Sequence, residues 1–91
     1  MATLIANDGT MTEVSAQGGC FSLDEMYALL ECTQVQVIYL RDGRIMWIDE
    51  EGKFKPHQVN IQATLLLQKA GGIPGDYVAG IALVTERTEV Q

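Results

Sequence analysis

The amino-acid sequence predicts an α+β fold: a single small domain with a mostly antiparallel sheet and two helices on one face. Its 91 residues, of which 47% are hydrophobic and 20% charged, are enough for one core and too few for two. Asp8-Gly9 and Asp42-Gly43 are hairpin-turn signals between runs of strand-forming residues. Two further stretches, 22–32 and 60–70, have helical spacing. These observations give the element order ββαββαβ.

The N-terminal part begins with a predicted hairpin, whose strands are Thr3–Ala6 and Met11–Ser15. A helix follows Ser22, because Ser22 and Glu25 have the spacing of a capping box. Phe21 and Met26 have the spacing of a hydrophobic staple around that cap. Four apolar residues at helical spacing are expected to share one face of this helix: Leu23, Met26, Tyr27 and Leu30.

The middle of the chain predicts a second hairpin from Val35–Leu40 and Ile45–Ile48, two runs rich in β-branched and aromatic residues. Strand alternation puts Val35, Val37 and Tyr39 on one face and Gln36, Ile38 and Leu40 on the other. Because apolar side chains occur in both sets, both faces of the hairpin are expected to be partly covered.

The C-terminal part predicts a helix and a buried strand. Asn60 is a suitable N-cap for a helix over Ile61–Ala70, which Gly71 and Gly72 would end. The apolar run Tyr77–Val84 is typical of a central strand buried on both faces. Residues 85–91 are predicted to be a frayed tail of the domain. The helix is expected to have a broad apolar face made of Ile61, Ala63, Leu65, Leu67 and Ala70.

The charge balance limits the classes of partner. Twelve acidic and six scattered basic residues give a net charge of −6, which disfavours direct binding to nucleic acid. An acidic surface of this kind can attract a protein with a basic surface. The N-terminus has no targeting or membrane-spanning pattern, so we expect a cytoplasmic protein with reduced cysteines and no membrane contact.

The acidic stretch Asp49–Glu51 invites a metal or catalytic interpretation, but a solvated turn explains it better. The residues after Asp49 do not alternate oxygen ligands as an EF-hand loop does, and three adjacent exposed acids do not have the contrasting environments of an acid/base pair. We therefore predict no metal site, no cofactor and no catalytic residue here. As a surface for a protein partner, the candidate residues are Asp42, Trp47, Asp49, Glu50, Glu51 and Phe54. For Trp47 the commoner outcome is instead core or half-buried packing as a cross-strand pair with Tyr39.

Two other kinds of site stay open. Glycine pairs next to the helices suggest a small-ligand or nucleotide module, although Asp24 and Glu25 would repel a phosphate at the first helix. A third hypothesis is an enzyme that uses Cys20 or Cys32 with His57. The candidate residues of the ligand module are Gly18, Gly19, Asn60, Lys69, Gly71 and Gly72.

Three motifs occur in the second half of the chain. They are the acidic turn Asp49–Lys53, Asn60 followed by Ala63 and Thr64, and the step Ile73, Gly75 and Asp76 into the last strand. With these motifs the chain resembles, over residues 22–84, a family of small proteins known only as a domain of unknown function and often found in bacteriophages, plasmids and other mobile elements. The resemblance implies a setting in which small acidic proteins act by stoichiometric binding, for example as inhibitors of host defence or nucleic-acid-processing proteins.

The sequence thus favours a non-enzymatic binding protein over a ligand module, and a ligand module over an enzyme. A homodimer is compatible with all three hypotheses, because a small domain can complete an apolar surface with a second copy.

Overall fold

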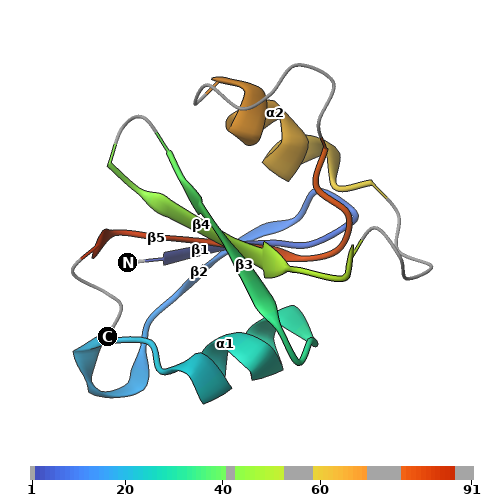
Figure 1. Ribbon diagram of the computed structural model, residues 1–91. Helices are drawn as coiled ribbons and strands as arrows, with labels where there is room; N and C mark the ends of the chain where they lie inside the picture. Colours follow the sequence, from blue (N-terminus) through green and yellow to red (C-terminus); the bar gives the residue numbers. More distant parts are fainter. Residues whose placement is uncertain (1, 41–42, 53–58, 70–76, 88–91) are drawn as a thin grey trace.

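The computed structural model describes residues 2–40, 43–52, 59–69 and 77–87 (Figure 1). Within them the chain forms five strands, two α-helices and a short 3-10 helix in the predicted order ββαββαβ. Their bounds are β1 Ala2–Ile5, β2 Met11–Val14, η1 Gln17–Gly19, α1 Leu23–Leu30, β3 Val35–Tyr39, β4 Ile45–Asp49, α2 Ile61–Lys69 and β5 Ala82–Thr85.

The five strands form one antiparallel sheet in the order β2-β1-β5-β4-β3. The two predicted hairpins, β1–β2 and β3–β4, are confirmed. β5 comes last in the chain and lies between them, where all four of its residues are buried. A central strand of a sheet that is covered on both faces has no solvated side. This explains why the sequence that leads into β5 is an uninterrupted apolar run.

The sheet has a hydrophobic core on each face, and each core has its own helix. On the upper face, Met46 and Ile48 of β4 pack with Ala63 and Leu67 of α2. On the lower face, Trp47 of β4 belongs to the cluster that α1 completes. Figure 1 shows α2 above the sheet and α1 below it.

The prediction of two helices on one face is therefore wrong. The physical reason lies in β4 and β5, whose alternating side chains are apolar in both directions, so each face must be covered. The expectation that both faces of the second hairpin are covered is confirmed by the same clusters.

α1 begins and ends as the local sequence predicts, with one difference on its surface. The Ser22 hydroxyl accepts a hydrogen bond from the Glu25 N–H, and the Glu25 carboxylate accepts one from the Ser22 N–H. Met26 and Leu30 are buried in the lower core. Leu23 is 48% exposed, so the predicted apolar face does not extend to the first turn.

α2 has a narrower buried face than predicted. Ala63 and Leu67 are buried, whereas Ile61 is 66% exposed and Leu65 is 48% exposed. A step of two residues turns an α-helix by about 200°, so the Ile61–Leu65 pair points away from the Ala63–Leu67 pair. Ala70, Gly71 and Gly72, with which the helix was predicted to end, lie outside the described residues.

The last strand begins and ends later than predicted. Gly80 has φ 94°, which interrupts extended backbone before β5, and the preceding segment makes only an isolated bridge from Ala79 to Val59. Thr85, predicted to start the tail, is the last residue of β5 and is 1% exposed. No helix among the described residues has the length and hydropathy of a membrane span.

Candidate functional site

The acidic turn after β4 is built from hydrogen bonds within the protein. Asp49 is 4% exposed, and its Oδ1 accepts a hydrogen bond of 2.9 Å from the Glu51 N–H. The Glu50 N–H donates to the Gln34 carbonyl at 3.1 Å, which continues the β3–β4 ladder into the turn. Gly52 packs so closely on the Ala79 carbonyl that a Cβ atom there would overlap with it. Asp49 and Gly52 therefore shape the turn, and of its three acids only Glu50 and Glu51 face solvent.

Trp47 does not stand on the surface beside these acids. It is half-buried in the lower core, and its Nε1–H donates a hydrogen bond of 3.0 Å to the Thr85 hydroxyl on the neighbouring strand. Asp42 and Phe54 lie outside the described residues. The structure thus leaves Glu50 and Glu51 as the exposed members of the predicted protein-binding surface, and it places Trp47 and Asp49 in structural roles.

Asn60 is the centre of a buried junction between α2, β1 and the segment before β5. It has no exposed surface. Its Oδ1 accepts the Ala63 N–H at 3.1 Å and caps α2, as predicted. Its Nδ2 donates to the carbonyls of Ile5 and Gly80, each at 2.9 Å. Every polar atom of the side chain is therefore bonded to the protein, and because the residue is completely buried a ligand cannot reach it.

Thr64 adds to the same junction. Its hydroxyl accepts a hydrogen bond of 2.9 Å from the Val78 N–H, while the Asn60 N–H donates to the Val78 carbonyl at 2.7 Å. The motif residues Asn60, Ala63 and Thr64 thus fix α2 onto the segment that leads into β5. We call this set of contacts, with the packing of Gly52 on Ala79, the Asn60 junction.

Among the residues predicted for a small-ligand module, those that the structure describes do not converge. Gly18 and Gly19 lie in η1, ahead of α1 and its lower-face core. Asn60 is buried at the start of α2, and Lys69 is exposed at its end, over the upper face. Gly71 and Gly72 lie outside the described residues. Because the glycine pair and α2 are on opposite sides of the sheet, they do not form one site.

The two cysteines of the predicted enzyme site differ in burial. Cys32 is 8% exposed and belongs to the lower core, whereas Cys20 is half-buried. His57 lies outside the described residues. Among the residues that the structure does describe, no group of three or more histidine, cysteine or acidic side chains could hold a metal ion.

A hollow on the upper face, between α2 and the β1–β2 side of the sheet, was not predicted. We call it the α2 groove. It has a volume of about 290 Å³, at the lower end of the roughly 300–1,000 Å³ typical of ligand pockets. The described residues that line it are Thr3, Ile5, Met11, Arg44, Gln62, Leu65, Leu66, Lys69 and Val84.

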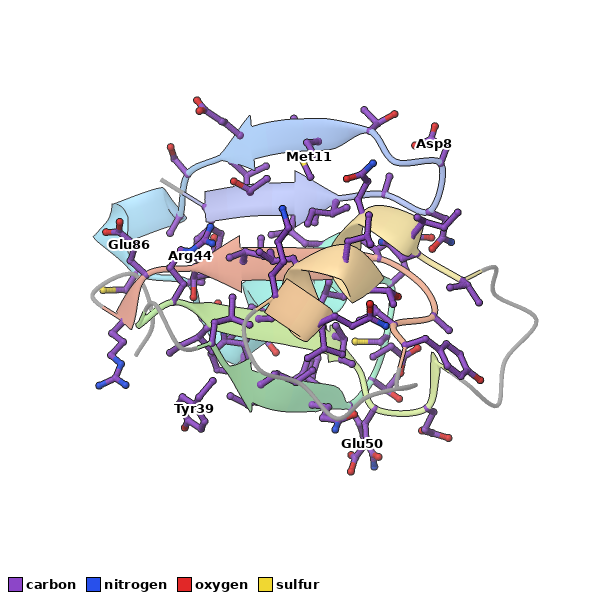
Figure 2. All side chains as sticks on the ribbon, turned by 90° about the horizontal axis from the view of Figure 1, so that it is seen from above. Asp8, Met11, Tyr39, Arg44, Glu50 and Glu86 are labelled. Carbon is purple, nitrogen blue, oxygen red and sulfur yellow. The ribbon has the colours of Figure 1, made fainter. Side chains whose placement is uncertain are left out.

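The α2 groove exists because α2 covers the sheet unevenly. The buried residues of α2 pack with side chains of β4 and β5, and β2 takes no part in that cluster. Met11 on β2 is consequently 54% exposed, and in Figure 2 it lies beside α2 rather than beneath it. Leu65, on the flank of α2, supplies the other exposed apolar wall.

The charge of the groove differs from that of the rest of the protein. Lys69 and Arg44 line it, and none of its described lining residues is acidic, although the chain has twelve acids and six bases. Arg44 lies next to Glu86, since Ile45 is paired with Thr85 in the sheet (Figure 2). Lys69 is therefore the more important of the two cations for binding a ligand. The groove combines an apolar floor with positive charge.

The charges lie towards one end of the groove. Lys69 is the last residue of α2, and Arg44 immediately precedes β4. Gln62 lies in the first turn of α2, close to Gly9 of the β1–β2 turn. Between these ends the lining is apolar and includes Ile5, a member of the upper core. A bound molecule would thus meet a cationic end, an apolar middle and an amide end.

The whole chain from residue 1 to residue 90 matches the model of one family, the domain of unknown function DUF3846. The chain belongs to this family. The match confirms the predicted resemblance to a domain of unknown function, and it extends over the N-terminal hairpin, which the resemblance did not cover. No curated protein and no solved structure matches the chain.

The family match gives the DUF3846 chain no assigned chemistry, and an origin in phages or plasmids stays a prediction. Of the residues that line the α2 groove, only Lys69 was singled out from the sequence. The others come from α2, β1, β2, β5 and the residue before β4, and they share no motif. Leu65 was predicted to belong to the apolar face of this helix, and the structure shows that it is 48% exposed and lines the groove.

Proposed function

We propose that this protein is a non-enzymatic binding domain whose α2 groove binds a small molecule with an apolar body and an anionic end. The observation that carries the proposal is an apolar hollow whose described lining includes Lys69 and Arg44 and no acid, in a protein with a net charge of −6. Because Glu86 lies next to Arg44, the proposal depends mainly on Lys69. The local charge of the groove is thus opposite in sign to the net charge of the protein. Solubility depends on the net charge and does not require such a cationic surface.

The arrangement of the groove supports one orientation of the ligand. The anionic end lies by Lys69 and Arg44, and the Thr3 hydroxyl is available as a hydrogen-bond donor in the same lining. The apolar body covers Met11 and Leu65, which are 54% and 48% exposed. Burial of these two side chains supplies a hydrophobic contribution, and the cations select the charge of the ligand.

The composition of the lining favours binding over catalysis. Hydroxyl nucleophiles in enzymes are usually activated by a neighbouring base such as an imidazole or a carboxylate. The described lining of the α2 groove contains no carboxyl, imidazole or thiol group, and its polar members are Thr3, Arg44, Gln62 and Lys69. These side chains can orient and hold an anion.

The proposal is tested with octanoate as the probe, followed by the amide signals of the ¹⁵N-labelled protein in NMR spectra. We expect saturable shifts at Thr3, Met11 and Leu65, and much smaller ones with octanol or octylamine at equal concentration. Shifts of equal size with octylamine would contradict the role of the cations. An absence of saturable shifts with octanoate would overturn the proposal.

A pair of charge-reversed variants separates the local from the overall electrostatic effect. Lys69→Glu is expected to weaken octanoate binding by about tenfold, because it removes one charge-assisted contact and adds a repulsive one. Arg87→Glu is the matched control, since Arg87 is exposed, does not line the groove and undergoes the same change of charge. Equal weakening by both variants would show that Lys69 has no specific role.

A further inference from the structure

We propose that β3 pairs in antiparallel fashion with β3 of a second copy of this chain, which joins the two sheets into one. β3 is an edge strand, and the described residues pair it with β4 alone. This surface is at the opposite edge of the sheet from β2, which borders the α2 groove. The inference is independent of the proposed ligand.

The hydrogen bonds of the β3–β4 hairpin identify the backbone groups that point outward. The Leu40 N–H donates to the Arg44 carbonyl, and the Glu50 N–H donates to the Gln34 carbonyl. In an antiparallel ladder the residues that bond to the neighbour alternate, so Gln34, Gln36, Ile38 and Leu40 face β4. The N–H and C=O groups of Val35, Val37 and Tyr39 therefore point away from the sheet, where another strand can meet them.

The β3 edge lacks the features by which proteins usually prevent such pairing. Its five residues, Val35–Tyr39, include no charge, no proline and no glycine, and all except Gln36 are strand formers. The other edge strand, β2, has four residues and carries Glu13. A charge and a shorter length protect β2, whereas β3 has neither protection.

Tyr39 identifies the second copy as the occupant. Its side chain is 70% exposed, the most exposed large apolar residue of the described chain, and it stands at the β3 edge (Figure 2). If Val37 is placed opposite Val37 of the partner copy, Tyr39 comes opposite Val35. Aromatic and β-branched residues form favourable cross-strand pairs, and the two-fold symmetry produces this pair twice. The strand is thus complementary to itself, without a like-charge contact.

The placement of α1 is compatible with this arrangement. The contacts of α1 with the sheet are mainly to β5 and β4, and Val35 at the start of β3 is half-buried beside its cluster. In the joined sheet, β2 of each copy forms an outer edge, so the two α2 grooves lie at the far ends of the dimer.

The first test is sedimentation velocity of the full chain over a wide range of protein concentration. We expect the wild-type protein to reach twice the monomer mass as the concentration rises. We expect Val37→Pro to remain monomeric, because proline removes an outward N–H without breaking a bond to β4. A wild-type protein that is monomeric at every concentration would overturn the proposal.

A second variant keeps the test valid if Val37→Pro does not fold. Tyr39→Lys changes an exposed side chain, and we expect it to raise the dimer dissociation constant about tenfold or more through the loss of both Tyr39–Val35 pairs. Leu23→Lys is the matched control, because Leu23 is also exposed and apolar but lies on α1. A dimer weakened equally by Leu23→Lys and Tyr39→Lys would contradict a β3 interface.

The pairing itself is observable in a mixed sample of labelled and unlabelled protein. Isotope-filtered NMR should detect contacts between Tyr39 of one copy and Val35 of the other. Contacts between copies that involve other strands and exclude β3 would overturn the proposal, whatever the mass of the assembly.

Discussion

The Asn60 junction and the α2 groove lie at the two flanks of the same helix and use polar residues in opposite ways. In the junction, each polar atom of the Asn60 side chain is bonded to the protein and no part of it is exposed. In the groove, Lys69 and Gln62 of the same helix border a hollow. The motif residues Asn60, Ala63, Thr64 and Gly52 gather in the junction, and the groove is made of residues without a motif.

The comparison teaches that a recognisable motif can be structural. Asn60 and Thr64 stand out in the sequence because a helix cap and three other side-chain hydrogen bonds to the backbone demand particular side chains, and Ala63 is buried in the upper core. A groove that accepts one class of ligand requires only apolar residues and a charge, which many residue types supply. Function is therefore better sought where the fold leaves a surface incomplete.

The largest expected effect concerns Asn60 itself. Asn60→Ala removes the cap of α2 and the side-chain hydrogen bonds to the carbonyls of Ile5 and Gly80. We expect the free energy of unfolding to fall by about 3–5 kcal/mol, measured by urea denaturation. Gln62→Ala, an exposed change on the same helical turn, should alter it by about 0.5 kcal/mol or less. Similar effects of both variants would remove the distinction between junction and groove.

Gly52→Ala should have the next largest effect. The new Cβ overlaps with the Ala79 carbonyl, and backbone cannot move aside as the end of a flexible side chain can. A loss of stability of about 2 kcal/mol is expected. Gly43→Ala is the control, since Gly43 has φ 93° with open space around it, and only its conformational cost of about 1 kcal/mol applies. A smaller loss at Gly52 than at Gly43 would contradict tight packing of the turn.

Neighbouring leucines of α2 sharpen the comparison. Leu65→Gln should leave the free energy of unfolding within about 0.5 kcal/mol of wild type, because Leu65 is 48% exposed, yet weaken octanoate binding about fivefold. Leu67→Gln should have a large effect on stability, since Leu67 is 4% exposed and a buried amide would lack partners. Unchanged octanoate affinity in Leu65→Gln would exclude Leu65 from the ligand contact.

The smallest expected effect is a pH dependence at the β1–β2 turn beside the groove. Hydrogen bonds from the Thr10 side chain, and then from its N–H, hold the pKa of Asp8 below its ordinary value of 3.8. The folded state thus binds this proton more weakly than the unfolded state. The stabilising contribution is complete above the ordinary pKa and is lost as pH falls through the lowered value.

This contribution can be measured by following the Asp8 carboxyl signal during an acid titration. Thr10→Ala should raise the pKa of Asp8 towards 3.8, because the side-chain hydrogen bond is the largest cause of the shift. In Asp8→Asn, the difference in stability from wild type should shrink as the solution becomes more acidic. A pKa of Asp8 that is the same in wild type and Thr10→Ala would contradict this cause.

The sequence predicted most local features of the fold and little of the candidate site. Ser22, Asn60 and the two hairpins were correctly assigned. Asp49 was taken for a solvated residue and is buried, whereas Trp47, a candidate for the partner surface whose alternative was packing in the core, is half-buried. Adjacency in the chain made Trp47 and the acids look like one surface. The strand period directs Trp47 into the lower core instead.

By itself, the sequence determined the order of the elements and their boundaries at caps and turns, since these depend on hydrogen bonds between residues a few positions apart. Only the tertiary structure decided which face each helix covers and which surface stays open. The bond from Asn60 to Ile5 joins residues 55 positions apart, and the α2 groove draws its lining from β1, β2, β5 and α2. Such contacts depend on packing of the whole chain, because no local pattern records which distant segment will be the neighbour.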